Sequence, residues 1–148
     1  MIPEDTADVI VRCQRDRTVH VRLCDRFRED QDCLHYAVEA SAPGLNARVD
    51  AVAAWNWDAD LAPFLDELAA DFRGWRGERV WQTADRDLAV RAIFHSGGHV
   101  AVSWTLCPWR NPTDGWKATV TTWLEAGEQM SILAADVRDF LHHEPETT

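Results

Sequence analysis

Hydrophobic and polar residues alternate along the first third of the chain. In residues 18–27, TVHVRLCDRF, one set of alternate positions is apolar and the other is mainly polar. The first set holds Val19, Val21, Leu23 and Phe27, and the second holds His20, Arg22, Cys24 and Arg26. Residues 34–40 repeat the pattern, with Leu34, Tyr36, Val38 and Ala40 on the apolar side. Successive side chains of a strand point to opposite faces, so the pattern predicts four antiparallel strands within residues 7–55, each with one buried face.

The hydrophobic period changes after residue 57. The segment DADLAPFLDELAADFRGW, residues 58–75, spaces its apolar residues three and four apart, which predicts an amphipathic helix. Asp60 suits the N-cap position, Pro63 the first turn and Gly74 the C-terminal stop. The apolar stripe of this helix consists of Leu61, Phe64, Leu65, Leu68, Phe72 and Trp75.

The second half of the chain repeats this order of elements. Alternation predicts strands over roughly 78–83, 87–95, 99–107 and 116–124, and the segment EQMSILAADVRDFL, residues 128–141, has the apolar arc of a second helix. The order ββββ-α-ββββ-α predicts an α+β fold with about eight antiparallel strands in one or more sheets and both helices packed on one face. We expect a single domain over residues 1–148, with an ordered core over about 7–141 and a tail over 142–148.

The segment AIFHSGGHVAVSW, residues 92–104, predicts a β-hairpin with a three-residue Ser-Gly-Gly loop. Apolar residues occupy even-numbered positions in both flanking strands, so only a register that pairs even with even keeps them on one face. A two-residue Gly-Gly turn would expose the apolar residues of one strand to water. We therefore expect His95 to pair with His99 on the face away from the core.

This histidine pair is the most site-like feature of the sequence, but it supplies only half of a zinc site, which needs three or four ligands. The same face adds Arg91, which repels a cation, and Cys107, which is eight residues along the strand from His99 and too far away. The chain also lacks phosphate-binding glycine loops and the HExxH, Walker A and GxSxG motifs. We expect no metal, no cofactor and no catalytic residues, so the sequence favours a binding protein over an enzyme.

Charge and composition narrow the partners. The chain has 25 acidic and 15 basic residues, a net charge of −10, which argues against nucleic acid and anionic membranes as partners. An acidic surface suits a basic protein partner, and it equally suits simple solubility. The sequence has no stretch near the roughly 20 apolar residues of a membrane span and no signal-peptide pattern. The four cysteines have no paired spacing, so we expect reduced thiols and a cytoplasmic location.

A partner-binding surface is expected on the outer faces of the two helices, which are acidic. Their acidic positions are Asp66, Glu67, Asp71, Glu128, Asp136 and Asp139. Ile132 falls among the acids of the second helix, as an apolar anchor in a protein contact surface would, although single exposed apolar residues are also common. Trp55, Trp57 and Trp109 fit either of two interpretations: they close the sheet edge over the first helix, or they form an aromatic contact patch.

A second hypothesis belongs to another functional class. The sheet face that carries the histidine pair could bind a small molecule or act as a cofactor-free enzyme. Its polar and aromatic residues are Arg91, His95, His99 and Trp123.

Three segments carry a resemblance to known families: SAPGLNARVD, LAADFRGW and HSGGHV. The chain resembles an uncharacterised domain family of high-GC actinobacteria over nearly its whole length, and the match is close in these three segments. In element order, and in a Leu-rich central helix followed by strands, the chain also resembles the WapI-like immunity proteins of bacterial contact-dependent toxin systems. The second resemblance implies a small acidic cytoplasmic protein that binds and blocks one protein toxin, and it assigns no individual residues.

Overall fold

The computed structural model describes residues 8–28, 32–55, 61–108 and 115–142. Its element order confirms the predicted ββββ-α-ββββ-α arrangement and the α+β class. The elements of the first half are β1 (Val9–Arg12), β2 (His20–Arg28), β3 (Cys33–Ala42), β4 (Leu45–Trp55) and α1 (Leu61–Ala70). Those of the second half are β5 (Glu78–Gln82), β6 (Leu88–His95), β7 (His99–Leu106), β8 (Ala118–Glu125) and α2 (Glu128–His142).

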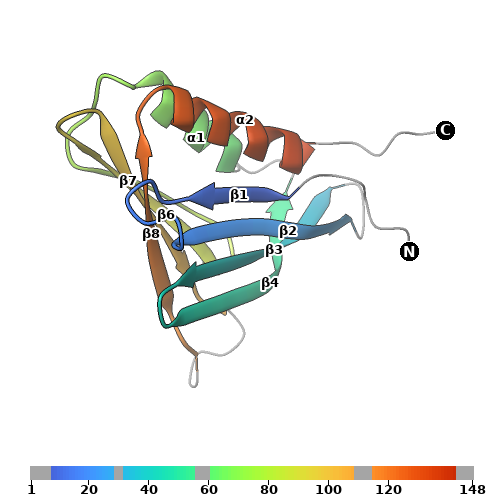
Figure 1. The fold of residues 1–148 in the computed structure, drawn as a ribbon. Coiled ribbons are helices and arrows are strands. Elements are labelled where there is room, and N and C mark those ends of the chain that lie inside the picture. The colour runs from blue at the N-terminus through green and yellow to red at the C-terminus, as the bar shows by residue number, and fades with distance from the viewer. Residues whose placement is uncertain (1–7, 29–31, 56–60, 109–114, 143–148) are drawn as a thin grey trace.

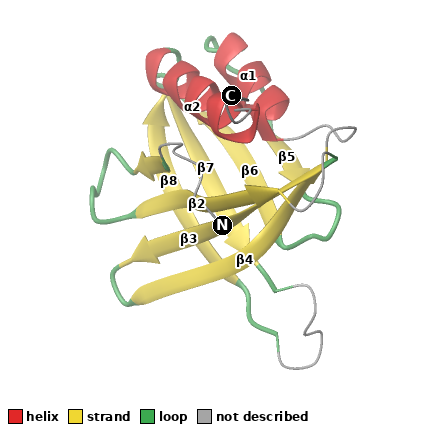
Figure 2. Cartoon of the chain, turned by 90° about the vertical axis from the view of Figure 1, so that its right-hand side faces the viewer, coloured by secondary structure: helices red, strands yellow, loops and turns green. Residues whose placement is uncertain are grey.

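The strands form two separate antiparallel sheets, with strand orders β1-β2-β3-β4 and β5-β6-β7-β8. The two sheets face each other, and the strands of one cross those of the other (Figure 2). Both helices lie side by side on one side of the molecule, where α2 packs against β1 and β8 and α1 against β5 (Figure 1). The inner faces of both sheets and the inward faces of both helices contribute to one hydrophobic core. Neither helix of the described residues is long and apolar enough to span a membrane.

The predicted hairpin register is confirmed. Leu88 pairs with Leu106 and the pairing continues without a shift to His95 and His99, so the loop is Ser-Gly-Gly as expected. Gly97 and Gly98 both have positive φ, which glycine adopts without steric cost. The apolar even-numbered positions of β6 and β7 therefore share the inner face, and both histidines lie on the outer face.

Helix α1 is shorter than the predicted segment. It ends at Ala70, so Phe72 and Trp75 lie beyond it, and Phe72 is 52% exposed. Gly74 is not at the helix end but four residues later, with a φ of 118°. The apolar spacing continued past the helix because Trp75 packs edge-on against Phe94 of β6, with ring centroids 5.5 Å apart. The predicted N-cap, Asp60, lies outside the described residues.

A β-bulge in β2 interrupts the alternation that the sequence predicts. One extra residue lies between Cys24 and Phe27, where Asp25 has a φ of 53°. A bulge shifts the residues after it to the opposite face. Arg26, predicted to face outward, is therefore buried, and Phe27, predicted to face the core, stacks on His35 on the outer side. The guanidinium of Arg48 in β4 pairs with the Asp25 carboxylate at 2.6 Å. This ion pair links the bulge in β2 to β4, on the other side of β3.

The inward turn of Arg26 connects the first sheet to α2. Its Nη1 donates a hydrogen bond to the carbonyl oxygen of Phe140 at 2.5 Å. The last carbonyl groups of a helix have no partner within it, and a cation there also interacts favourably with the helix dipole. Tyr36 of β3 meets the Phe140 ring edge-on, with centroids 5.9 Å apart. The C-terminal turn of α2 is thus fixed against the first sheet.

Substitution of Gly74 tests how closely its backbone packs against the Phe94 ring, and Gly44 serves as the control. A Cβ at Gly74 would lie 2.9 Å from the Phe94 ring, whereas a Cβ at Gly44 (φ 78°) would meet nothing within 4 Å. We expect Gly74→Ala to lower the free energy of unfolding by about 2–4 kcal/mol, and Gly44→Ala by only about 1 kcal/mol, the cost of the positive φ alone. Urea denaturation of both variants measures the difference. Equal losses would contradict the close contact with Phe94.

Candidate partner-binding surface and neighbouring cavities

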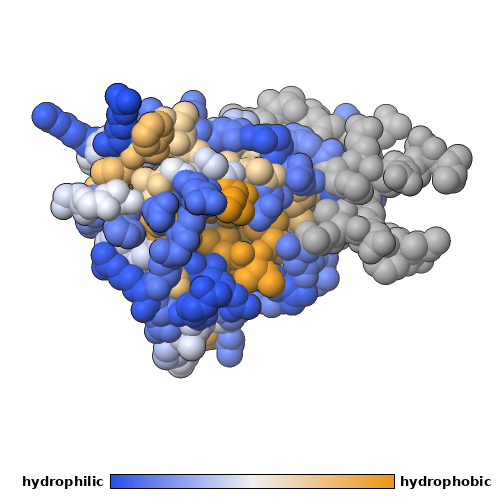
Figure 3. All heavy atoms as spheres, turned by 45° about the horizontal axis from the view of Figure 1, so that its top comes forward, coloured by the Kyte–Doolittle hydropathy of each residue, from blue (hydrophilic) through white to orange (hydrophobic). Residues whose placement is uncertain are grey.

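Two large apolar side chains are exposed on either side of one groove between α2 and β1. Ile10 in β1 is 50% exposed and Ile132 in α2 is 53% exposed. The groove between them has a volume of ≈ 230 Å³, and its other lining residues include Leu124, Gln129, Asp136 and the basic Arg12 of β1. Figure 3 shows apolar atoms gathered in the middle of this face with hydrophilic side chains around them. We call the groove with Ile10, Gln129, Ile132, Asp136 and the adjacent Asp139 the α2–β1 surface.

Sequence reasoning had singled out Ile132 but not Ile10. The signal was the same for both: an apolar residue at a position that the local periodicity assigns to solvent. In β1, Val9 and Val11 are buried and Ile10 lies between them on the outer face. The two isoleucines come from elements 122 residues apart, so only the fold shows that they line one groove.

The predicted acidic residues divide into two groups. Asp66 of α1 pairs with Arg138 of α2, and Asp71 pairs with Arg79 at 2.5 Å. These two carboxylates are therefore partly neutralised within the chain. The other four form no salt bridge among the described residues, although Arg138 interacts electrostatically with Asp139: Glu67, Glu128, Asp136 and Asp139. Three of these four lie on α2, so the unpaired negative charge concentrates on that helix.

Asp136 lies in an electrostatically unfavourable position. Partial burial raises the pKa of its carboxyl group above the ordinary value, and the neighbouring Asp139 carboxylate raises it further. Both effects disfavour the charged form of Asp136. A cationic group placed beside this pair would offset the repulsion, which makes the site favourable for a lysine or arginine.

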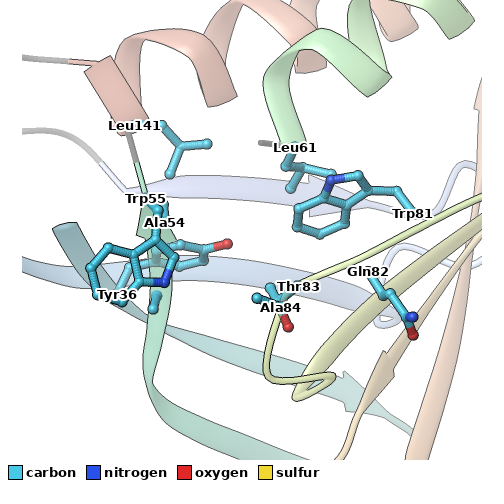
Figure 4. A pocket seen from close by; sticks show the side chains of 10 residues that line it. Tyr36, Ala54, Trp55, Leu61, Trp81, Gln82, Thr83, Ala84 and Leu141 are labelled. Atoms are coloured by element: carbon cyan, nitrogen blue, oxygen red, sulfur yellow. The ribbon is translucent and has the colours of Figure 1, made fainter. Parts of the chain in front are cut away.

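Of the three tryptophans that the sequence assigned either to the sheet edge or to a contact patch, only Trp55 lies within the described residues. Trp55, at the end of β4, is half-buried and lines a second cavity, while Trp57 and Trp109 lie outside the described residues. This cavity has a volume of ≈ 230 Å³ and lies between the edge strands β4 and β5. We call it the aromatic cavity, because Tyr36, Trp55 and Trp81 line it. Figure 4 shows Trp55 and Tyr36 on one side, Trp81 on the other, and Leu61 and Leu141 above.

A buried carboxyl group lies behind the floor of the aromatic cavity. Thr83, which lines the cavity, donates a hydrogen bond at 2.5 Å to Oδ1 of Asp87. Asp87 is only 1% exposed, and its Oδ2 has no hydrogen-bond partner among the described residues. Burial raises the pKa of this carboxyl group, against the hydrogen bond from Thr83, which lowers it. The local sequence pattern gives no sign that Asp87 is buried, so only the structure reveals this carboxyl group.

The predicted ligand face of the second sheet is divided in two. At the hairpin end, Trp123 lies between Arg15, whose guanidinium is 3.5 Å from the indole ring centroid, and His95, whose ring centroid is 4.6 Å from that of Trp123. The rest of the face is an open trough of ≈ 760 Å³ that includes Arg91 but neither histidine nor Trp123. Arg91 and the histidine pair therefore do not line one pocket. The loop that carries Arg15 covers the tryptophan instead.

Nucleophilic and metal-ligating groups are dispersed in the described residues. No three His, Cys, Asp or Glu side chains lie close enough there to hold a metal ion. All four cysteines are free, and burial raises the pKa of the Cys24 thiol to about 11. The Sγ of Cys33 lies 3.7 Å from Nε2 of His35, but Cys33 is fully buried and so has no access to a substrate. That the protein works without metal, cofactor or catalysis stays a prediction.

Comparison with known families identifies the chain at the family level. A family model described as "Family of unknown function (DUF6228)" matches residues 12–144. The chain belongs to this family. No curated protein and no solved structure matches it significantly. Membership in DUF6228 agrees with the expected uncharacterised domain family. Because the family description names no function, a function has to be inferred from the groove and cavities described above.

The buried carboxyl group of Asp87 predicts a specific pH dependence of stability. A group with a raised pKa binds its proton more tightly in the folded state, so it reduces stability as pH rises from its ordinary pKa of 3.8 through the folded pKa. Asp87→Asn removes this loss and keeps an oxygen for Thr83. We expect the free energy of unfolding of the variant, relative to the wild type, to increase with pH over this window.

Urea denaturation at several values between about pH 4 and pH 7 measures this difference. Glu67→Gln, the same carboxylate-to-amide change at an exposed position of α1, serves as the control for the loss of one negative charge. If Asp87→Asn and the wild type differed by a constant amount at every pH, the carboxyl group would not titrate as proposed.

Proposed function

We propose that this protein is a non-enzymatic binding protein that recognises a basic protein partner through the α2–β1 surface. The observation that carries the proposal is the pair of exposed isoleucines on the two sides of one groove, with unpaired carboxylates beside them. Interface hot spots have this arrangement: a central region that becomes fully desolvated, with surrounding contacts that exclude water. Asp66 and Asp71 form ion pairs within the chain. Of the predicted acidic surface, the proposal therefore keeps only the part on α2.

The apolar part of this surface provides binding energy. Complete burial of an isoleucine side chain stabilises a complex by about 1.5–3 kcal/mol, and each of the two isoleucines is about half exposed. Together they contribute about 2 kcal/mol when a partner covers them, which is a factor of about 30 in affinity. The groove between them is large enough for one or two side chains of the partner.

The acidic part of the surface selects the partner. An arginine or lysine side chain fits the groove because its aliphatic stem can contact Ile10 and Ile132 while its charged end reaches Asp136. This contact would also relieve the repulsion between Asp136 and Asp139. The net charge of −10 adds long-range attraction, which raises the association rate with a basic protein.

The resemblance in element order to WapI-like immunity proteins supports a narrower form of the proposal. In this form the partner is a basic toxin, and the complex forms in the cytoplasm, where the four thiols stay reduced. The partner would then inhibit growth when it is produced alone. Co-production of this protein would relieve the inhibition.

A pull-down comparison tests the proposal through paired variants. Ile10→Ser combined with Ile132→Ser removes both apolar anchors, whereas Val80→Ser alters an even more exposed apolar residue (64% exposed) on β5. We expect a partner that the wild type and Val80→Ser retain from a lysate of the native host. The double variant should bind the purified partner at least about tenfold more weakly.

Charge reversal supplies the second half of the test. Asp136→Lys should weaken the same complex and reduce its dependence on salt, while Asp85→Lys, at an exposed position of the β5–β6 turn, should leave binding within about twofold. A partner that binds the isoleucine and Asp136 variants as tightly as the wild type would overturn the proposal. A partner whose complex is insensitive to salt would overturn its electrostatic part.

A further inference from the structure

We propose that the aromatic cavity binds a small, uncharged, planar aromatic compound of one or two fused rings. This site is separate from the α2–β1 surface, and neither proposal depends on the other. The sequence suggested a small-molecule site on the outer face of the second sheet. The site proposed here lies instead at the junction between the two sheets.

The position of the cavity follows from the topology. β4 ends the first sheet and β5 begins the second, so the two sheets are not hydrogen-bonded to each other along this side. The end of β4, the start of α1, the turn after β5 and the end of α2 meet around the opening. These four segments share no strand pairing with one another and leave a space that a single continuous sheet would close. Ligand cavities commonly form at such junctions.

The size of the cavity fits a ring compound. Dry apolar cavities of about 150 Å³ in other proteins bind benzene. The aromatic cavity, at ≈ 230 Å³, has room for a second fused ring. Trp55 and Trp81 are only half-buried, so a ligand would cover aromatic surface that is now in contact with water.

The chemistry of the lining defines the ligand class. Three aromatic side chains from three strands meet here, and aromatic rings gain about 0.5–1.5 kcal/mol from a further ring in an offset or edge-on arrangement. Among the described residues, the lining contains no carboxylate, guanidinium, ammonium or imidazole group, so it offers no partner for a charged ligand. Thr83 and Gln82 supply hydrogen-bonding groups on one side, which suits a ring with a single polar substituent or ring N–H.

The trough on the second sheet is a weaker candidate. It is larger, but its floor consists of short side chains whose hydroxyl groups already bond to each other: Ser103 to Thr121 at 2.8 Å and Thr105 to Thr119 at 2.9 Å. Its Arg91 lies 3.6 Å from the Glu78 carboxylate. These hydroxyl groups satisfy one another, so the floor of the trough offers a ligand few free hydrogen-bonding groups.

Titration of the wild-type protein with indole tests the inference directly. The chain has eight tryptophans, whose indole N–H groups give separate signals in a two-dimensional ¹H–¹⁵N NMR spectrum. Trp55→Phe and Trp81→Phe assign the two cavity signals. We expect these two signals to shift in a saturable manner with a dissociation constant of about 0.1–1 mM, as for a ligand of about nine non-hydrogen atoms. The signal of Trp116, which is 41% exposed and outside the cavity, should not shift.

Matched ligands separate the chemical classes. Phenol should bind more tightly than cyclohexanol by at least about fivefold, because the two molecules have similar size and polarity but only phenol is planar and aromatic. Choline probes the alternative that the three rings form a cation site. Binding of choline in preference to indole, or equal binding of phenol and cyclohexanol, would overturn the assigned ligand class.

A pair of variants checks the location. Trp81→Ala removes one wall of the cavity and should weaken indole binding at least about tenfold, while Trp116→Ala should leave it unchanged. Because Trp81→Ala could also unfold the protein, Ala54→Leu, which fills the cavity from β4, provides a second test with the same expected loss. The proposal is wrong if indole shifts no tryptophan signal at saturation, or if both cavity variants bind it as the wild type does.

Discussion

The contact between Arg26 and the last turn of α2 sets the geometry on which both candidate sites depend. The guanidinium reaches a helix carbonyl that has no partner within the helix, and it does so from inside the first sheet. It points inward only because the bulge at Asp25 reverses the alternation of β2. A local irregularity in one strand thus fixes a helix that is more than a hundred residues away in the sequence.

Once α2 is fixed, its two ends form parts of two different sites. Near its N-terminus, Ile132 and Asp136 face Ile10 across the groove with β1. At its C-terminus, Leu141 closes the aromatic cavity beside Trp55 and Trp81. A partner on the α2–β1 surface and a ring compound in the aromatic cavity would therefore contact the same rigid element, although neither site needs the other for its own chemistry.

Most of the fold could be predicted from local sequence patterns. Strand alternation, the helical stripes and the parity of β6 and β7 were sufficient for the element order and for the His95–His99 register. The bulge in β2 escaped prediction because an extra residue leaves no mark in composition: Arg26 and Phe27 simply exchange faces. The sites were harder still. Ile132 stood out within its own helix, but its partner Ile10 and the set of Tyr36, Trp55 and Trp81 come together only through tertiary packing.

The central claim is that a basic protein partner covers the α2–β1 surface, and hydrogen exchange of the backbone amides in the purified complex tests it most directly. The account predicts slower exchange in β1 and along α2 on complex formation, with no change in β6 and β7. Slower exchange confined to the second sheet, with β1 and α2 unchanged, would contradict the account and place the partner on the opposite side of the molecule.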